Sequence, residues 1–211
     1  MNKPHKFFER FLDNDLNNLY NYLISQQKEL LSGNIGDIPK DILNKHSGVS
    51  APTTKLGSYY NIFKFDNVYV SNLLDALRSA TEEASEYYGF NYNNQDYMIN
   101  GWYNVDYRVE IAGVVSPIKK PSHYHDHMGG EGAPVFHGYY CVNAEPSITY
   151  YKIGGIDGVE FENINKNNRA IISETGHPHG RDDWHDDKPR ITIAYDICPA
   201  SHGYGPNWIK L

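Results

Sequence analysis

The sequence predicts an α+β protein in which helices come first and an all-β half follows. Two stretches in the first 90 residues repeat apolar side chains three and four apart, which is the spacing of an amphipathic helix. From about Tyr92 the apolar runs are short, rich in aromatic and β-branched residues, and separated by Gly, Pro and Asn. Many short strands without intervening helices are typical of a sandwich or barrel.

The helical half contains two predicted helices. The first lies in FLDNDLNNLYNYLIS, with Asp13 as its cap. Its helically spaced apolar residues are Phe11, Leu12, Leu16, Leu19, Tyr20 and Leu23. The second helix begins at Ser71 and ends at Gly89, a residue suited to a helix C-terminus. Its repeat is Leu73, Leu77, Ala80, Ala84 and Tyr87. Residues 33–57 are predicted to be mostly loop because Gly, Pro, Ser and Thr punctuate them.

The β half contains six predicted strand regions. They are YMINGWYNVDYRVEIAGVV, SHYHDHM, VFHGYYCVN, SITYYKI, RAIISE and RITIAYDI. The length of 211 residues suits one domain that spans residues 1–211. Within it we expect residues 1–90 to be a mainly helical support and residues 91–200 to be the β core that carries the function.

Charge and composition exclude several classes of partner. The formal net charge is −7, which argues against binding to nucleic acid or to an anionic membrane surface. No apolar run is long enough for a transmembrane helix, and the charged N-terminus lacks a signal-peptide core. Cys141 and Cys198 are the only cysteines. We therefore expect a cytoplasmic protein with reduced thiols, although one disulfide bridge remains open.

The histidines point to a metal site. Seven of the ten lie between positions 123 and 185, and SHYHDHMGG holds three of them at alternate positions. On a strand, these three side chains share one face. Iron sites that activate oxygen use a few imidazole and carboxylate ligands on one face of the metal. Two ligands from His125 and His127, with His179 from a distant strand, would make such a set.

Two alternatives to this ligand set stay open. Asp126 lies between two of the histidines, and a bulge could turn its carboxylate inward in place of His127. In the second segment, ETGHPHGRDDWHDD, His177 competes with His179. We favour His179 because of its spacing to Arg190.

Arg190 opens the last predicted strand, and Thr192 shares its face. An arginine inside a barrel needs an anionic partner because its charge does not titrate away. A small dicarboxylate that also chelates the metal would be such a partner, bound in a two-pronged geometry with an added hydrogen bond from the hydroxyl. The alternative is that Arg190 pairs with a structural carboxylate.

Three motifs carry a resemblance to a known family. HDHM, FHGYYCVNAEPSITYY and HGRDDW followed by PRITIAYDICP resemble the 2-oxoglutarate- and Fe(II)-dependent oxygenases. The likeness covers roughly residues 97–199 and is to a phage-type branch akin to prolyl 4-hydroxylases. It implies a double-stranded β-helix, or jelly roll, with the N-terminal helices packed on it.

The resemblance also implies roles for single residues. A histidine near position 125 and His179 would bind Fe(II), and Arg190 with Thr192 would hold the distal carboxylate of 2-oxoglutarate. Tyr139 is the tyrosine that we expect to reach the cosubstrate. The implied reaction uses dioxygen to hydroxylate a C–H bond of a peptidyl or small-molecule substrate, and it releases succinate and CO2.

The sequence departs from the family pattern at one ligand. The family motif is His-x-Asp or His-x-Glu followed by a distant histidine, whereas the residue two positions after His125 is His127. A three-histidine site occurs in the thiol dioxygenases, another family of iron barrels. Two alternative functions therefore stay open. One is a cupin-like non-heme iron enzyme that does not use 2-oxoglutarate, and the other is a non-catalytic jelly-roll binding or structural protein.

Overall fold

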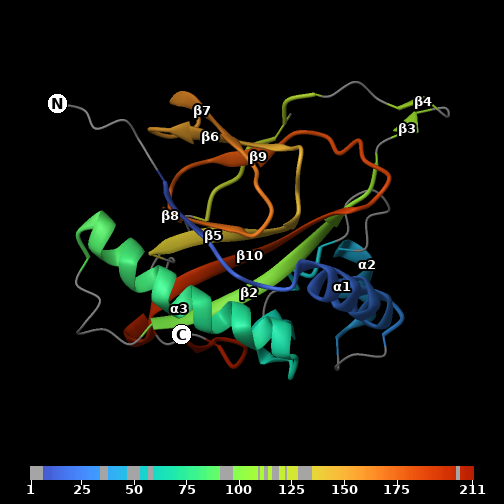
Figure 1. Cartoon of the computed structure of the whole chain (residues 1–211), viewed down its shortest axis with the longest axis horizontal. Helices are drawn as coiled ribbons and strands as arrows, with labels where there is room; N and C mark the ends of the chain where they lie inside the picture. The colour runs from blue at the N-terminus through green and yellow to red at the C-terminus, as the bar shows by residue number, and fades with distance from the viewer. Residues whose placement is uncertain are drawn as a thin grey trace.

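The computed structural model gives the elements shown in Figure 1. It describes residues 7–33, 38–46, 53–56, 59–90, 97–108, 110–111, 114–115, 119–121, 123–127, 135–202 and 205–211. The helical elements are α1 (Leu16–Leu31), α2 (Lys40–His46), the 3-10 turns η2 (Ile62–Lys64) and η4 (Ala200–His202), and α3 (Val68–Tyr88). The strands outside the two larger sheets are β3 (Glu110–Ile111) and β4 (Val114–Val115), which pair with each other.

A six-stranded antiparallel sheet forms the centre of the molecule. In spatial order its strands are β1 (Phe8–Phe11), β8 (Arg169–Glu174), β5 (Phe136–Asn143), β10 (Arg190–Pro199), β2 (Tyr97–Asp106) and β11 (Ile209–Lys210). The longest pairing joins β10 to β2 along ten residues, from Arg190 opposite Asp106 to Pro199 opposite Tyr97. On its other side β10 pairs with β5, where Asp196 lies opposite His137.

A smaller antiparallel sheet faces the first. Its strands are β7 (Val159–Ile164), β6 (Ile148–Ile153) and β9 (His179–Arg181). The segment around His125 extends this sheet, since His125 forms an isolated antiparallel bridge with His179. Figure 1 shows the small sheet on one side of the large one and α3 on the other. The protein is thus a mixed α/β structure with antiparallel sheets and few helices, consistent with a jelly-roll-like fold.

The two long helices form where the sequence predicts them, but their starts differ. Helix α1 begins at Leu16 because the carboxylate of Asp15, rather than Asp13, accepts the backbone N–H of Asn18. Helix α3 begins before Ser71, because the Asn67 side chain accepts the N–H groups of Tyr69 and Val70.

The end of α3 is as predicted, since Gly89 takes the left-handed conformation with φ 79°. Tyr87 is exposed rather than part of the buried face. Helix α1 packs against β5, and α3 packs against β1 and β8, so both support the outer face of the large sheet.

Several other expectations were wrong. Phe11 belongs to a strand rather than to the first helix, because β1 pairs with β8 at the edge of the large sheet. Helix α2 lies inside the region predicted to be loop. Residues 123–127, the described part of SHYHDHM, do not form a regular strand, and only His125 among them makes a bridge. The sequence patterns also missed β7, a partly exposed edge strand, and the two-residue strand β11. Strand β9 carries His179, as expected of a histidine on a distant strand.

Cys141 and Cys198 are buried and free, as expected, so the alternative of a disulfide between them is not realised.

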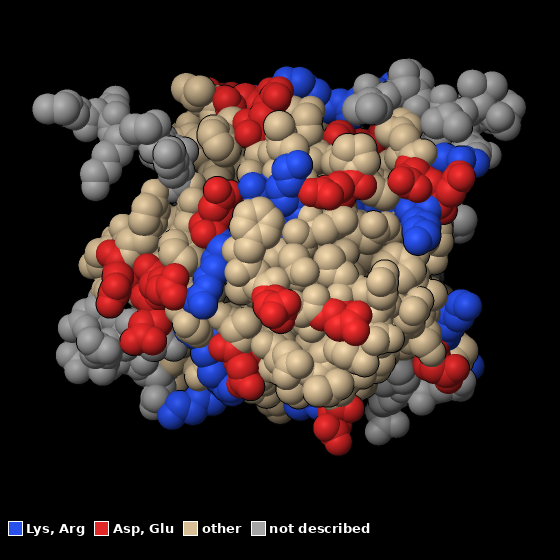
Figure 2. Space-filling model, in the orientation of Figure 1, with Lys and Arg blue, Asp and Glu red and all other residues tan. Residues whose placement is uncertain are grey.

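The surface agrees with the charge balance. On the face shown in Figure 2, acidic and basic side chains are interspersed, with no continuous basic area of the kind that nucleic-acid binding uses. In the part of the chain that is described, no helix has the length and apolar character needed to cross a bilayer.

Alternation along β5 divides its side chains between two faces, and this division makes Gly138 a sensitive position. His137 and Tyr139 line a cavity between the sheets, whereas Gly138 lies on the opposite face against Tyr195. A Cβ atom added at Gly138 would lie 2.4 Å from the Ile171 carbonyl oxygen and 2.4 Å from the Tyr195 ring. Neither neighbour can easily move, because both residues are buried within the large sheet.

We predict that Gly138→Ala lowers the free energy of unfolding by about 1–3 kcal/mol, the usual cost of overpacking a core. Gly205→Ala is the matched control, because nothing lies within 4 Å of its added Cβ and the change should stay within about 0.5 kcal/mol. Urea unfolding of both variants measures the difference. Equal stabilities for the two variants would contradict the prediction.

Candidate metal centre

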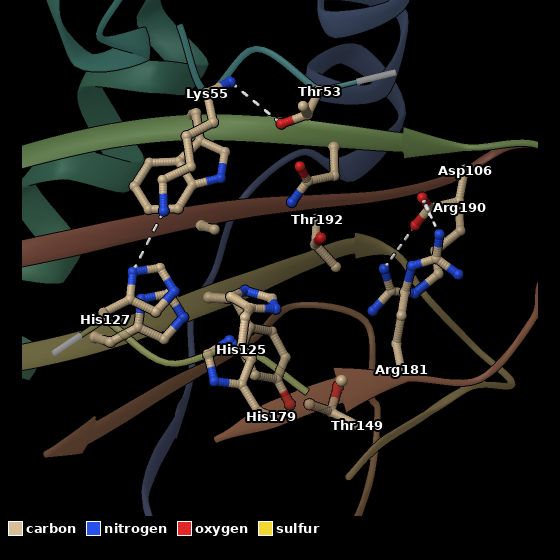
Figure 3. A pocket seen from close by; sticks show the side chains of 16 residues that line it. Thr53, Lys55, Asp106, His125, His127, Thr149, His179, Arg181, Arg190 and Thr192 are labelled. Atoms are coloured by element: carbon tan, nitrogen blue, oxygen red, sulfur yellow. Dashed lines mark hydrogen bonds and ion pairs between the residues drawn. The ribbon is translucent and has the colours of Figure 1, made fainter. Parts of the chain in front are cut away.

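A cavity of about 410 Å³ lies between the two sheets. Strands β2, β5 and β10 of the large sheet line one side of it, and β6, β9 and the segment at His125 line the other. Figure 3 shows imidazole side chains in one part of the cavity and two arginines beside an aspartate in another. The cavity therefore contains both groups that the sequence singles out, the histidines and Arg190.

The three histidines predicted as ligands lie together. His125, His127 and His179 each offer one ring nitrogen, and these nitrogens all lie within 4.8 Å of one another. The ring centroid of His125 is 4.4 Å from that of His179 and 5.4 Å from that of His127. The backbones of His125 and His179 exchange both N–H···O bonds, at 3.0 and 2.8 Å, which fixes the two segments relative to each other. Two strand segments distant in sequence thus place three imidazoles around one point.

Hydrogen bonds orient two of these rings. The Nδ1 of His179 lies 3.1 Å from the His177 carbonyl oxygen, which can only accept, so Nδ1–H donates and Nε2 keeps its lone pair. The Nδ1 of His127 lies 3.0 Å from the Asp196 carboxylate, and its Nε2 is buried with no hydrogen-bond partner among the described residues. A buried imidazole nitrogen without a partner is costly unless something fills the position that it faces. A metal ion bound to Nε2 would do so.

The electrostatics keep two of these rings, His125 and His179, in the neutral form that binds metal. Burial, with the neighbouring His127, lowers the pKa of His125 to about 4. Burial and the surrounding imidazoles lower the pKa of His179 well below its ordinary value. The donor set, the neutral charge state and the unpartnered nitrogen all fit a divalent transition metal.

A second group of possible ligands shares one of the histidines. It consists of His127, His137 and Asp196, whose donor atoms also lie within 4.8 Å of one another. The His137 ring stacks on His127 with centroids 3.6 Å apart, and its Nδ1 lies 2.9 Å from Asp196. Burial lowers the pKa of His137 to about 4. In this group the Nδ1 atoms of both histidines already form hydrogen bonds with the Asp196 carboxylate. The unpartnered atom of His127 is Nε2, which does not take part in these bonds.

The other predicted ligands lie elsewhere. Asp126 is exposed and belongs to neither group, so nothing in the structure supports its replacing His127. His177 contributes its carbonyl oxygen to the orientation of His179, while its ring lies against Phe7 with centroids 6.0 Å apart.

Arg190 lies in the arginine-rich part of the cavity and is paired. Its Nη1 lies 2.9 Å from Asp106 Oδ2, and its Nε donates to Ser147 Oγ at 3.1 Å. Arg181 donates to the other oxygen of the same carboxylate at 2.5 Å. Thr192 lines the cavity beside them, as its spacing from Arg190 predicts. The structure thus supplies the structural carboxylate that the sequence left open as an alternative, but it shares that carboxylate between two guanidinium groups.

Tyr139 lines the cavity, but its hydroxyl is already engaged. The hydroxyl donates to Asn165 Oδ1 at 2.9 Å and accepts from Asn163 Nδ2 at 2.7 Å. Burial raises its pKa to about 12. Contact of this hydroxyl with a cosubstrate would therefore need one of these bonds to break.

Sequence reasoning missed five residues of the site: Lys55, Asp106, His137, Arg181 and Asp196. Two of them could have been found by extending the strand alternation, because Arg181 lies two residues after His179 and Asp196 lies six after Arg190. Asp106 and His137 lie on β2 and β5, and the pairing of these strands with β10 places them opposite Arg190 and Asp196. Lys55 comes from the N-terminal region, and its Nζ lies 4.3 Å above the Trp102 ring and 3.5 Å from His127 Nδ1.

Comparison with known proteins finds similarity in structure alone. No family model matches the chain, and no curated protein matches its sequence significantly. A prolyl-4-hydroxylase from Pseudomonas putida aligns over 92% of this chain and 93% of its own, with a TM-score of 0.52 and 7% identity. A non-heme monooxygenase solved as a nickel complex aligns over 92% of this chain and 74% of its own, with a TM-score of 0.49 and 10% identity. At 7% identity, the likeness to the prolyl-4-hydroxylase shows only that the two chains share a fold.

Proposed function

We propose that this protein is a 2-oxoglutarate- and Fe(II)-dependent oxygenase that hydroxylates a C–H bond of a peptidyl or small-molecule substrate. The observation that carries the proposal is that one cavity joins a three-histidine set with an unpartnered nitrogen to a wall with two arginines. The two sheets around this cavity would be the two halves of a double-stranded β-helix. The fold shared with a bacterial prolyl-4-hydroxylase is compatible with this chemistry. The phage-type branch rests on the sequence motifs alone.

His125, His127 and His179 would hold the iron. When bound, Fe(II) with 2-oxoglutarate supplies the oxidising chemistry, which couples decarboxylation of the keto acid to succinate with transfer of one oxygen atom to substrate. The chain's own residues supply the position and charge of the ligands. Because the three imidazoles are neutral, they leave the positive charge of the metal intact for an anionic chelator.

The arginine-rich part of the cavity suits the far carboxylate of that chelator. Among the charged residues that line the cavity, Lys55, Arg181 and Arg190 are cations and Asp106 is the one carboxylate. A dianion such as 2-oxoglutarate therefore enters a cavity whose wall is net positive before any metal is added. Arg190 is buried and uses two donors on Asp106 and Ser147, so its remaining N–H groups and the Thr192 hydroxyl can serve the ligand.

One observation favours a second candidate. The three-histidine set without a carboxylate ligand, together with the pairing of Arg190 to Asp106, fits a non-heme iron enzyme that does not use 2-oxoglutarate. This candidate keeps the iron but assigns Arg190 a structural role. The two candidates differ in what Arg190 does for cosubstrate binding.

The first prediction concerns the metal. His179→Ala should lower Fe(II) affinity by more than about 100-fold, because it removes a metal ligand. Loss of a residue that only hydrogen-bonds to a ligand typically costs about 10- to 100-fold. Anaerobic equilibrium titration of metal-free protein measures this. His123→Ala is the matched control, since His123 is exposed near the cavity and belongs to neither histidine group. Equal Fe(II) binding by the His179→Ala and control proteins would remove the proposed centre.

The second prediction concerns the cosubstrate. Anaerobic 2-oxoglutarate should give the Fe(II) protein a visible charge-transfer band, and Arg190→Gln should need about 10- to 100-fold more 2-oxoglutarate to reach it. A hydrogen bond to a charged group is worth about 1.5–3 kcal/mol, and 1.4 kcal/mol is tenfold in affinity. Arg181 still pairs with Asp106 in this variant, so that carboxylate keeps a partner.

Arg78→Gln is the control, because Arg78 pairs with Asp75 on the exposed face of α3, away from the cavity. A band that appears equally in all three proteins would give Arg190 a structural role. Iron binding without any band would favour the candidate that does not use 2-oxoglutarate. Absence of iron binding in the wild type would leave a non-catalytic protein.

A further inference from the structure

The carboxylate that the ligand motif lacks is present elsewhere in the site. Strand β10 points every second side chain toward the cavity, and Arg190, Thr192 and Ala194 line it in this way. Asp196 is the next residue on the same face, and it lies directly opposite His137 of β5. The strand that bears the arginine at its start therefore carries an acidic side chain beside the histidines.

Asp196 makes two hydrogen bonds to imidazoles. Its Oδ1 lies 3.0 Å from His127 Nδ1 and 2.9 Å from His137 Nδ1, and its side chain is 14% exposed. A carboxylate oxygen within hydrogen-bond distance of an imidazole nitrogen accepts from it, so both Nδ1 atoms carry a proton and donate to Oδ1.

This arrangement fixes the tautomer of His127. With the proton on Nδ1, the lone pair is on Nε2, which is buried and has no hydrogen-bond partner among the described residues. Nε2 is then the nitrogen that His127 can offer to a metal held with His125 and His179. The stacked His137 ring, 3.6 Å away and tilted by 16°, restricts rotation of His127 about its own bonds. A carboxylate that accepts from the far nitrogen of a metal-binding histidine orients the ring and raises its basicity.

Asp196 could instead be a metal ligand itself, in the group with His127 and His137. Three observations oppose this. A metal there would compete with the two short hydrogen bonds to the carboxylate, and it would leave His127 Nε2 buried and unpartnered. The Lys55 ammonium lies 3.5 Å from His127 Nδ1, so a divalent cation bound to that nitrogen would face a second positive charge.

We propose that Asp196 is the carboxylate of this metal centre and acts through His127, as a positioning residue rather than as a ligand. The inference rests on the proposed metal set of His125, His127 and His179. In the oxygenase motif a carboxylate binds the metal directly. Here the carboxylate of Asp196 would instead contact the metal ligand His127. His137 is the second donor that keeps Asp196 in place, and it does not bind the metal.

Cobalt(II) binding to the metal-free protein tests this, with the metal's visible absorption as a report on its ligands. Asp196→Asn keeps the size of the side chain and removes its charge, while its amide oxygen can still accept from the two imidazole N–H groups that donate to Oδ1. We expect Co(II) affinity to fall by about 10- to 100-fold, with a shifted visible spectrum in the saturated variant. Asp196→Glu keeps the charge and should bind more tightly than Asp196→Asn. Asp157→Asn, an exposed aspartate outside the cavity lining, should match the wild type.

His137→Phe separates positioning from ligation. It keeps an aromatic ring against His127 but removes the nitrogen that donates to Asp196, so Co(II) affinity should fall no further than in Asp196→Asn, while His179→Ala should abolish binding. Loss of binding in His137→Phe with retention in His179→Ala would overturn the proposal and place the metal on Asp196. This comparison decides the matter even where Asp196→Asn fails to fold, which thermal unfolding of the metal-free variants would reveal.

The remaining outcomes also decide. Wild-type affinity and spectrum in a folded Asp196→Asn protein would overturn the role of Asp196 while leaving the His125, His127 and His179 centre intact. Absence of Co(II) and Fe(II) binding in the wild type would overturn the metal centre itself, and this inference with it.

Discussion

The antiparallel pairing of β10 with β2 on one side and β5 on the other is the constraint on which the site depends. Its register sets Arg190 opposite Asp106 and Asp196 opposite His137. Because side chains alternate between the two faces of a strand, the same pairing turns all four toward the cavity side and leaves Gly138 and Tyr195 toward the helices. A shift of one residue in either register would exchange these faces. The contact of Arg190 with Asp106 and the place of Asp196 beside the histidines therefore both result from the position of β10 between β2 and β5.

Burial of so many ionisable groups is tolerable because the structure pairs them. Asp106 lies between two guanidinium groups, and Asp196 lies between two imidazole N–H groups. A buried ion pair is weak evidence for stability, since desolvation offsets much of the attraction between its charges. The charges and polar atoms that this pairing does not satisfy tell more about what the cavity can bind. Two arginines share one carboxylate, and His127 Nε2 has no hydrogen-bond partner among the described residues, so the cavity retains the capacity to bind an anion and a cation together.

The sequence predicts those features that depend on local period. Alternation identified His125 with His127 and Arg190 with Thr192, and helical spacing identified both long helices. It did not identify Asp106 or His137, because their roles come from strands paired across the sheet rather than from neighbours in sequence. Strand β1 was missed because its four residues become a strand only by pairing with β8, more than 150 residues away. The helix starts were missed because several nearby polar residues can serve as caps, and only the backbone conformation selects Asp15 and Asn67.

The departure of the ligand motif from the pattern of the 2-oxoglutarate-dependent oxygenases would have a physical consequence for cosubstrate binding. Three neutral imidazoles would leave a bound Fe(II) its full double charge, whereas a carboxylate ligand would cancel one unit. A dianionic keto acid would therefore be attracted more strongly to such a centre, and the two arginines would add to this attraction. The cost would be a centre with excess positive charge when the dianion is absent. In its proposed role, Asp196 would reduce that cost from behind His127 without taking a coordination position.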